Sequence, residues 1–267
     1  MKILDLDREP FYAISFLTAA HGGGVVAEML PFLRGRVDVL PDGVKALLVT
    51  SDLQGVASHP KLGGETALLG EVVAEVYAEL ADEGTVTALE NTGVLLAGDY
   101  YSTPGGDKRG ASGDVRDVWL AFAAGYRWVA GVAGNHDQFG AAGQRRHLEC
   151  EPNAHLLDNN VIDLDGLRVG GVGLIPGRPE KEGRRDEAEF YAAINMVVDE
   201  KPDVLVLHQG PRGRRDQPGD ESVRDRLQGW VSSLTICGHS HWNDPLGEIE
   251  GGPQILNVDA RVVILTE

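Results

Sequence analysis

Five short apolar runs recur along the chain, and a polar segment follows each of them at once. The runs cover residues 46–51, 93–97, 127–133, 203–207 and 233–237. Segments whose apolar residues have helical spacing lie between or after them, at residues 65–83, 112–124, 185–200 and 220–228. This alternation is typical of layered α/β folds and disfavours an all-α or all-β fold. A hairpin is expected around the turn Asp165-Gly166, and more strands are expected within residues 246–265.

Residues 1–45 are harder to interpret than the rest of the chain. We expect them to form an extension, with one strand and one helix, packed on the edge of the core. No repeat, low-complexity tract or linker divides the sequence, so a single domain over residues 1–267 is expected.

The balance of charge excludes several kinds of partner. The chain has 24 Lys and Arg residues against 41 Asp and Glu residues, a net charge of −17. Such a charge repels polyanions, so binding to nucleic acid or to an anionic membrane is disfavoured. The two cysteines, Cys150 and Cys237, lack metal-ligand spacing and cannot form a disulfide scaffold. With no evident signal peptide or membrane span, we expect a soluble cytoplasmic protein.

The polar segments after the five runs are rich in side chains that can bind metals. They supply Asp52, Gln54, Asp99, Asn135, His136, Asp137, His208, His239 and His241. Since ligands bind outside the carboxyl ends of strands in open α/β sheets, these side chains are expected at one edge. Mixed Asp, Asn and His ligands favour Mn, Fe or Zn over Mg or Ca. The set is large enough for two ions that share a carboxylate, and paired ions about 3.5–4 Å apart promote in-line displacement at phosphorus.

The order of these motifs resembles that of the calcineurin-like metallophosphoesterase superfamily. The specific parts are the tetrapeptides Gly134-Asn135-His136-Asp137 and Gly238-His239-Ser240-His241. The resemblance also includes Asp52-x-Gln54, Gly98-Asp99 and His208, and it extends from about residue 46 to the C-terminus. It implies two mixed β-sheets packed as a sandwich and flanked by helices, an αββα arrangement, with a two-metal site at the strand ends.

The resemblance also implies a role for each matching residue. Asp99 would bridge two divalent or trivalent ions, with Mn preferred and Fe or Zn as alternatives. One ion would be held by Asp52, Gln54 and His241, and the other by Asn135, His208 and His239. His136 would stand beside the phosphoryl group and stabilise or protonate the leaving oxygen, while Asp137 would help to orient that histidine. Together they would constitute a phosphatase or phosphodiesterase in which a metal-bridged hydroxide attacks phosphorus in line.

Two positions depart from the family pattern. Gln54 stands where the family usually has a histidine, and its amide oxygen is a weaker and harder ligand than imidazole. Ser102 stands three residues after Asp99, where many members have a carboxylate that pairs with the histidine matching His136. Both changes bear on the rate and on metal preference, and neither bears on the fold.

Residues outside the motifs carry weaker signals. Arg212 and Arg214 follow His208 and could clamp a substrate phosphate, or they could lie in a solvated loop. Tyr100 could stack on a nucleobase or pack beneath the site. The sequence His21-Gly22-Gly23-Gly24 mimics an esterase oxyanion loop, but the chain has no Gly-x-Ser-x-Gly motif, so a flexible turn is the better interpretation.

Two functions therefore remain. The first is a dinuclear metal-dependent hydrolase of a small phosphomonoester or a nucleotide-type phosphodiester. The second is a catalytically weak or inactive scaffold of the same fold that binds metal or a phospho-ligand, which Gln54 and Ser102 favour. A nuclease is disfavoured, because no basic stripe with interleaved aromatic residues is present.

Overall fold

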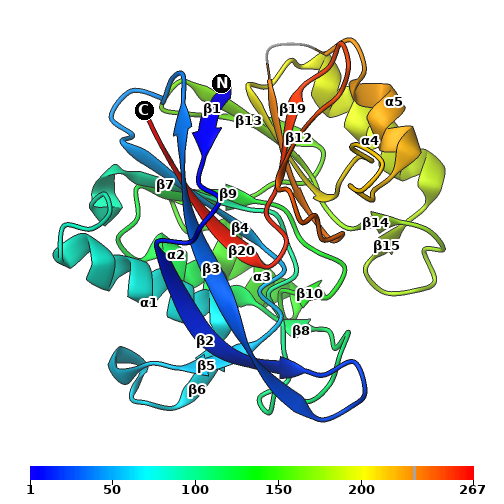
Figure 1. The fold of residues 1–267 in the computed structure, drawn as a ribbon. Helices are drawn as coiled ribbons and strands as arrows, with labels where there is room; N and C mark the ends of the chain where they lie inside the picture. Colours follow the sequence, from blue (N-terminus) through cyan, green and yellow to red (C-terminus); the bar gives the residue numbers. More distant parts are fainter. Residues whose placement is uncertain (231–232) are drawn as a thin grey trace.

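The apolar runs predicted from the sequence form the central strands of two β-sheets that pack face to face (Figure 1). The computed structural model describes residues 1–230 and 233–267. Its larger sheet has ten strands in the order β11-β9-β7-β4-β20-β3-β2-β5-β6, with β1 paired to β3. These strands are β1 (Ile3–Leu6), β2 (Tyr12–Ala19), β3 (Val25–Val37), β4 (Ala46–Ser51), β5 (Val56–Ser58), β6 (Thr66–Leu68), β7 (Thr92–Leu96), β9 (Trp128–Gly131), β11 (Ala154–Leu156) and β20 (Arg261–Thr266).

The second sheet has six strands, and it contains the predicted hairpin. Its order is β12-β13-β16-β17-β19-β18, and β12 and β13 pair in antiparallel fashion across the turn at Asp165-Gly166. The strands are β12 (Asn160–Leu164), β13 (Leu167–Val172), β16 (Val204–Gln209), β17 (Leu234–Gly238), β18 (Leu246–Glu248) and β19 (Gln254–Asn257). Strands β4, β7 and β9 are parallel to one another in the first sheet, as β16 and β17 are in the second, so each set ends at one sheet edge.

Alternating side chains divide the buried interior into three layers. In β4, Leu47 and Val49 face the second sheet and pack near Val204 and Ile236, whereas Leu48 faces the opposite layer. That opposite layer contains α1 (Leu69–Asp82) and α2 (Arg116–Ala123), followed along the chain by α3 (Ala142–Glu149). On the outer face of the second sheet lie α4 (Glu187–Asp199) and α5 (Glu221–Leu227). The predicted αββα sandwich is therefore confirmed.

The prediction for residues 1–45 is wrong in two respects. The segment contains three strands and no helix among its described residues, and β3 lies inside the large sheet, between β20 and β2. The reason is visible in the pairing of β2 with β3, where Ile14 and Phe16 of β2 and Leu30 and Phe32 of β3 are buried on one face. This alternation with period two stabilises a hairpin, not a helix.

The β2–β3 hairpin extends beyond the neighbouring strand on one side. β20 pairs with β3 only from Phe32 onward, so the first part of β3 and its partner β2 project past the end of β20 (Figure 1). Exposed Leu17, Val25 and Met29 lie on this projecting part. Its turn, residues 20–24, comes close to the segment that precedes β8 (Gly113–Asp114).

The four predicted helices are present with shorter bounds. The predicted helix over 112–124 begins at Arg116, because residues 113–114 pair as β8 with β10 (Asp137–Gln138). Helix α3 was not predicted, because its sequence is polar and only Leu148 is buried. Two very short strands, β14 (Ile175–Pro176) and β15 (Arg184–Arg185), pair outside the two main sheets. Within residues 1–230 and 233–267, none of the helices has the length and apolar character needed to span a bilayer.

Candidate metal centre

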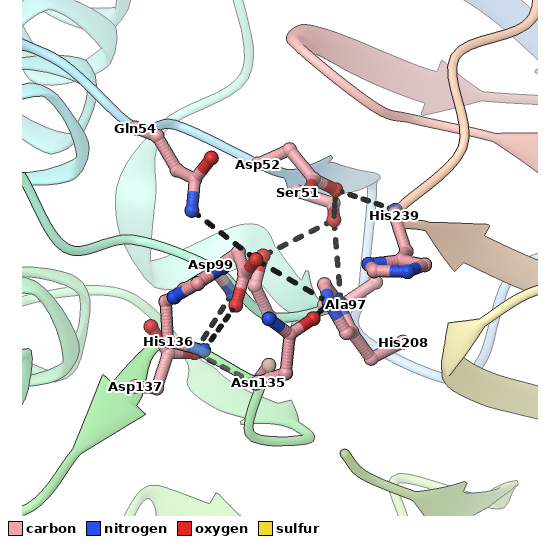
Figure 2. A network of polar contacts seen from close by, with 12 residues as sticks. Ser51, Asp52, Gln54, Ala97, Asp99, Asn135, His136, Asp137, His208 and His239 are labelled. Atoms are coloured by element: carbon pink, nitrogen blue, oxygen red, sulfur yellow. Dashed lines mark hydrogen bonds and ion pairs between the residues drawn. The ribbon is translucent and has the colours of Figure 1, made fainter. Parts of the chain in front are cut away.

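The loops that follow β4, β7, β9, β16 and β17 meet at one place, as Figure 2 shows. Three of the residues in these loops have left-handed backbone conformations, with φ of 55° at Asp52, 62° at Asp99 and 65° at His239. Such conformations are costly for residues other than glycine, and they cluster where a site requires a fixed geometry. The chain thus holds these three side chains in a constrained arrangement at the strand ends.

Two glycines allow the loops after β7 and β9 to approach so closely. A Cβ atom at Gly134 would stand 2.0 Å from Oδ1 of Asp99, and one at Gly98 would stand 2.5 Å from the backbone nitrogen of Gly134. Neither position can accept a side chain. These glycines therefore set the distance between Asp99 and the Gly-Asn-His-Asp segment.

Asp99 lies at the centre of the polar network. Its Oδ1 accepts a hydrogen bond of 2.8 Å from the backbone N–H of His136. Its Oδ2 accepts one of 3.2 Å from the amide of Gln54 and lies 3.5 Å from Nε2 of His208. Burial by itself would raise the pKa of Asp99, but the charges of His208 and His136 and their hydrogen bonds hold that pKa below its ordinary value. Asp99 is thus an anion placed between the two groups of candidate ligands.

His208 is oriented for metal binding through one ring nitrogen. Nδ1 lies 2.8 Å from the carbonyl oxygen of Ala97 and must donate to it, because a carbonyl only accepts. Nε2 therefore faces inward, 3.0 Å from Oδ1 of Asn135. Burial would lower the pKa of His208, but the carboxylate of Asp99 and its hydrogen bond outweigh burial and raise that pKa to about 10. A metal ion would take the place of the proton on Nε2.

His239 is poised as a neutral ligand beside His208. The two rings meet edge to face, with centroids 5.0 Å apart. Burial and then the positive charge of His208 lower the pKa of His239 to about 4, so its imidazole keeps a free lone pair at neutral pH. Its backbone N–H donates to Oδ2 of Asp52 at 2.8 Å, which ties the loop after β17 to the loop after β4.

Asp52 and His241 lie on the other side of the centre. Asp52 is hydrogen-bonded to the hydroxyl of Ser51, and burial, then the nearby charge of Asp259, raises its pKa well above the ordinary value. His241 is half exposed, and its Nδ1 lies 3.0 Å from Oδ1 of Asp259. A bound cation would relieve the repulsion between these buried acidic groups.

The donor set fits a metal centre. Ligand atoms of Asp99, His208 and His239 all lie within 4.8 Å of one another. Asn135 approaches this trio through the hydrogen bond to His208. Imidazole, carboxylate and amide oxygen together suit Mn, Fe or Zn. On the side of Asp52, Gln54 directs its amide nitrogen toward Asp99, so its carbonyl oxygen would have to turn inward to ligate.

His136 and Asp137 have different surroundings. Nδ1 of His136 lies 3.2 Å from the hydroxyl of Ser112, and the ring lines an open cleft. The carboxylate of Asp137 accepts three hydrogen bonds of 2.8 Å, from the backbone N–H groups of Asp99, Tyr100 and Gly134. Asp137 thus joins the loops after β7 and β9, and the side-chain hydrogen bond to His136 comes from Ser112.

The cleft beside the centre has a volume of about 480 Å³. Metal-ligand candidates line one part of it, and the β2–β3 hairpin contributes Phe16, Thr18, His21 and Glu28 to another. The segment before β8 adds Lys108 and Arg109. This volume is in the range that accommodates a nucleotide-sized ligand.

The three residues considered for substrate contact are not among the described residues that line the cleft. Tyr100 is fully buried beneath the site, where its hydroxyl donates to the carbonyl oxygen of Thr50 at 2.9 Å, and Tyr101 is the tyrosine that lines the cleft. Arg212 forms an exposed ion pair with Glu221 at 2.6 Å. Neither Arg212 nor Arg214 is among the described residues that line the cleft. Among the described residues, no hydrogen bond or ion pair joins either arginine to a candidate ligand.

Sequence reasoning missed several residues of the site, among them two that contact candidate site residues and two cations that line the cleft. Ser112 and Asp259 contact His136 and His241, and Lys108 and Arg109 line the cleft. None of them belongs to a motif or directly follows one of the apolar runs. Only Asp259 had a detectable signal, since it precedes the apolar residues of β20 at the same sheet edge.

The chain belongs to the calcineurin-like phosphoesterase family, whose model matches residues 46–243. The match includes every predicted metal ligand and His136. None of the curated proteins with which the chain was compared matches it. Among solved structures, it is similar to the protein of unknown function AQ665 from Aquifex aeolicus, with 16% identity and a TM-score of 0.36 over 82% of this chain and 95% of that one.

Proposed function

We propose that the protein is a dinuclear metal-dependent hydrolase of small phosphoesters, either a monoester or a nucleotide-type diester. The observation that carries this proposal is the meeting of Asp52, Asp99, His208 and His239 at the strand ends of the family fold. When bound, two ions would activate a water for attack and stabilise the phosphoryl oxygens. Asp52, Gln54 and His241 would hold one ion, Asn135, His208 and His239 the other, and Asp99 would contact both.

The residues of the chain would then direct a simple displacement. The oxygen of water would form a bond to phosphorus and give up one proton to solvent, and the bond from phosphorus to the leaving oxygen would break with its electron pair on that oxygen. His136, which lines the cleft and contacts Ser112 at 3.2 Å, would donate a proton to the leaving oxygen. Asp137 would support this step indirectly, through the three backbone hydrogen bonds that fix the loops carrying Asp99 and His136.

The size of the cleft and the overall charge favour a small substrate. A cleft of about 480 Å³ can accept a nucleotide-sized molecule, and a net charge of −17 opposes the approach of a polynucleotide. The competing proposal is a metal-binding scaffold without turnover. It is favoured by the orientation of Gln54, whose amide nitrogen contacts Asp99 at 3.2 Å, and by Ser102 at the position of the expected carboxylate.

A comparison of two nitrophenyl esters tests the proposal. Metal-stripped protein is loaded with Mn, and its hydrolysis of 4-nitrophenyl phosphate is compared with that of bis(4-nitrophenyl) phosphate. We expect turnover of one ester that falls at least about 100-fold in Asn135→Ala, which lacks a ligand of the second ion. Asn160→Ala, an exposed position on β12, is the matched control and should retain full activity. Bound Mn, Fe or Zn without hydrolysis of either ester would support the scaffold instead.

A further inference from the structure

Two cations in the cleft have no acidic partner. Lys108 and Arg109 are the lysine and arginine among the described residues that line it. Across residues 1–230 and 233–267, no ion pair of the structure involves either of them. What distinguishes these two cations is their place, because they line the same cleft as the candidate metal ligands in a chain that has 41 acidic residues. Their positive charge makes this part of the cleft suited to an anionic ligand.

The β2–β3 hairpin holds Arg109 in place. Nη1 of Arg109 lies 2.7 Å from the ring nitrogens of His21, in the turn of the hairpin, and it can donate a hydrogen bond only to the one that carries no proton. Gly106 of the same segment packs against the carbonyl oxygen of Leu17, where a Cβ atom would stand at 3.0 Å. The segment before β8 and the hairpin are therefore in contact and line the same part of the cleft. Anchoring at two points reduces the freedom that Arg109 would lose on binding a ligand.

This wall lies on the side of His136. Gly110, the residue after Arg109, stands against the imidazole, because a Cβ atom on it would be 3.5 Å from Cε1 of His136. If His136 protonates the leaving oxygen, the part of the substrate that departs must lie next to residues 108–110. Of the described acidic residues that line the cleft, Asp52 and Asp99 are candidate ligands and Asp259 contacts one. The remaining acidic residue is Glu28, on β3 of the hairpin.

We propose that Lys108 and Arg109, with His21, form an anion-binding subsite that selects phosphoesters whose leaving group carries a second negative charge. This inference rests on the proposed function and specifies its substrate class. The guanidinium of Arg109 would bind a phosphate or carboxylate of the leaving group, and Lys108 would add a second positive charge. The role of the hairpin is then to complete this subsite.

Substrates that differ only in that charge test the subsite. The pair is 3-carboxy-4-nitrophenyl phosphate and its 3-carboxamido analogue. Each is also prepared as the methyl diester, so that the comparison can be made whether the protein hydrolyses monoesters or diesters. We expect kcat/KM for the carboxylate to exceed that for the carboxamide by about 10-fold or more in the Mn-loaded protein. In Arg109→Gln the ratio should fall toward one, and Arg109→Lys should restore part of it. Arg145→Gln removes an equal charge from α3 and should leave the ratio unchanged.

A binding measurement separates this inference from the proposed function. Inorganic pyrophosphate is titrated into metal-free protein while the backbone amides of residues 108–110 are followed by NMR. Saturable shifts that disappear in Arg109→Gln support the subsite, even if no ester is hydrolysed. Equal kcat/KM for the two esters, a ratio that survives in Arg109→Gln, or amides that pyrophosphate leaves unshifted would overturn it.

Discussion

Some residues beside the candidate metal centre are placed to orient a ligand through a hydrogen bond, and Asp259 is the clearest case. Nδ1 of His241 lies 3.0 Å from its carboxylate, so Nε2, which lies 3.3 Å from Nη2 of Arg261, would be the ring nitrogen to bind a metal. Asp259→Asn should weaken binding of one of two Mn ions about 10-fold or more, since carboxylates that orient ligating histidines have effects of this size. Calorimetric titration with Mn provides the measurement, and exposed Asp216→Asn is the control. Two unchanged dissociation constants would show that Asp259 does not position His241.

Asp137 offers a second test at this scale. Its buried carboxylate accepts three backbone N–H groups, and an amide in its place would set an NH₂ group against some of them. We expect Asp137→Asn to lower the free energy of unfolding by about 3 kcal/mol. Urea denaturation measures this change, with exposed Asp216→Asn as the reference. Unchanged stability combined with slower turnover would instead favour the direct orienting role that the family resemblance implies.

The motif residues were predictable as an ordered set, whereas their supporting partners were not. The order of Asp99, Asn135, His208 and His239 after apolar runs is enough to predict a candidate metal centre without any structure. Ser112 reaches His136 only because β8 pairs with β10, a contact between two strands of two residues each. Such short pairings leave no periodic pattern in a sequence, so the partner of the histidine could not be identified.

At the scale of elements, an ion pair between Arg127 and Asp165 links the two sheets away from the candidate metal centre. Asp165, in the turn between β12 and β13, accepts hydrogen bonds of 2.6 and 2.7 Å from Arg127 and one of 2.8 Å from the indole of Trp128 on β9. The hydrogen bonds from Arg127, together with the one from Trp128, hold the pKa of Asp165 below its ordinary value. A carboxylate with a depressed pKa stabilises the folded state above its unfolded pKa of about 3.9, and this stabilisation is lost as the pH falls through the folded pKa.

Asp165→Asn isolates this contact, because asparagine tolerates the left-handed backbone at this position, where φ is 55°. The pair is partly exposed, so we expect the variant to lose about 1 kcal/mol of unfolding free energy at pH 7. The difference from the unmodified protein should shrink at pH 3. Urea denaturation at the two pH values measures it, and exposed Asp42→Asn serves as control. A difference that is independent of pH would exclude the charge as its source.

Elements whose apolar residues repeat at regular spacing were predicted well, and elements fixed by tertiary contacts were not. The hairpin β12–β13 and the strand ends that carry ligands agree with the sequence to within a few residues. Residues 1–45 were misjudged because glycines and polar residues interrupt their alternation, and because the insertion of β3 between β20 and β2 joins distant segments of the chain. The sequence of β3 contains no signal that it pairs with β20, the last strand of the chain.

At the scale of the whole molecule, the excess of negative charge and the candidate metal centre should both make the stability of the folded state depend on divalent cations. With a net charge of −17, any salt should stabilise the folded state by screening the repulsion between acidic residues. Asp52, Asp99, His208 and His239 should in addition bind a few ions specifically. Specific binding adds about 2.7 kcal/mol to the free energy of unfolding for each site at 100 times its Kd. For a chain of 267 residues this amounts to a rise of several degrees in Tm.

The specific part can be separated from screening. Thermal unfolding at a fixed scan rate is followed in Mn and in KCl of equal ionic strength, because screening depends on ionic strength and ligation does not. We expect Mn to raise Tm several degrees above the KCl value. Asn135→Ala should lose much of that increment, and Asn160→Ala should keep it. If Mn and KCl give the same Tm, cations affect the acidic groups at the strand ends only by non-specific screening. Neither the hydrolase nor a metal-binding scaffold would then be tenable.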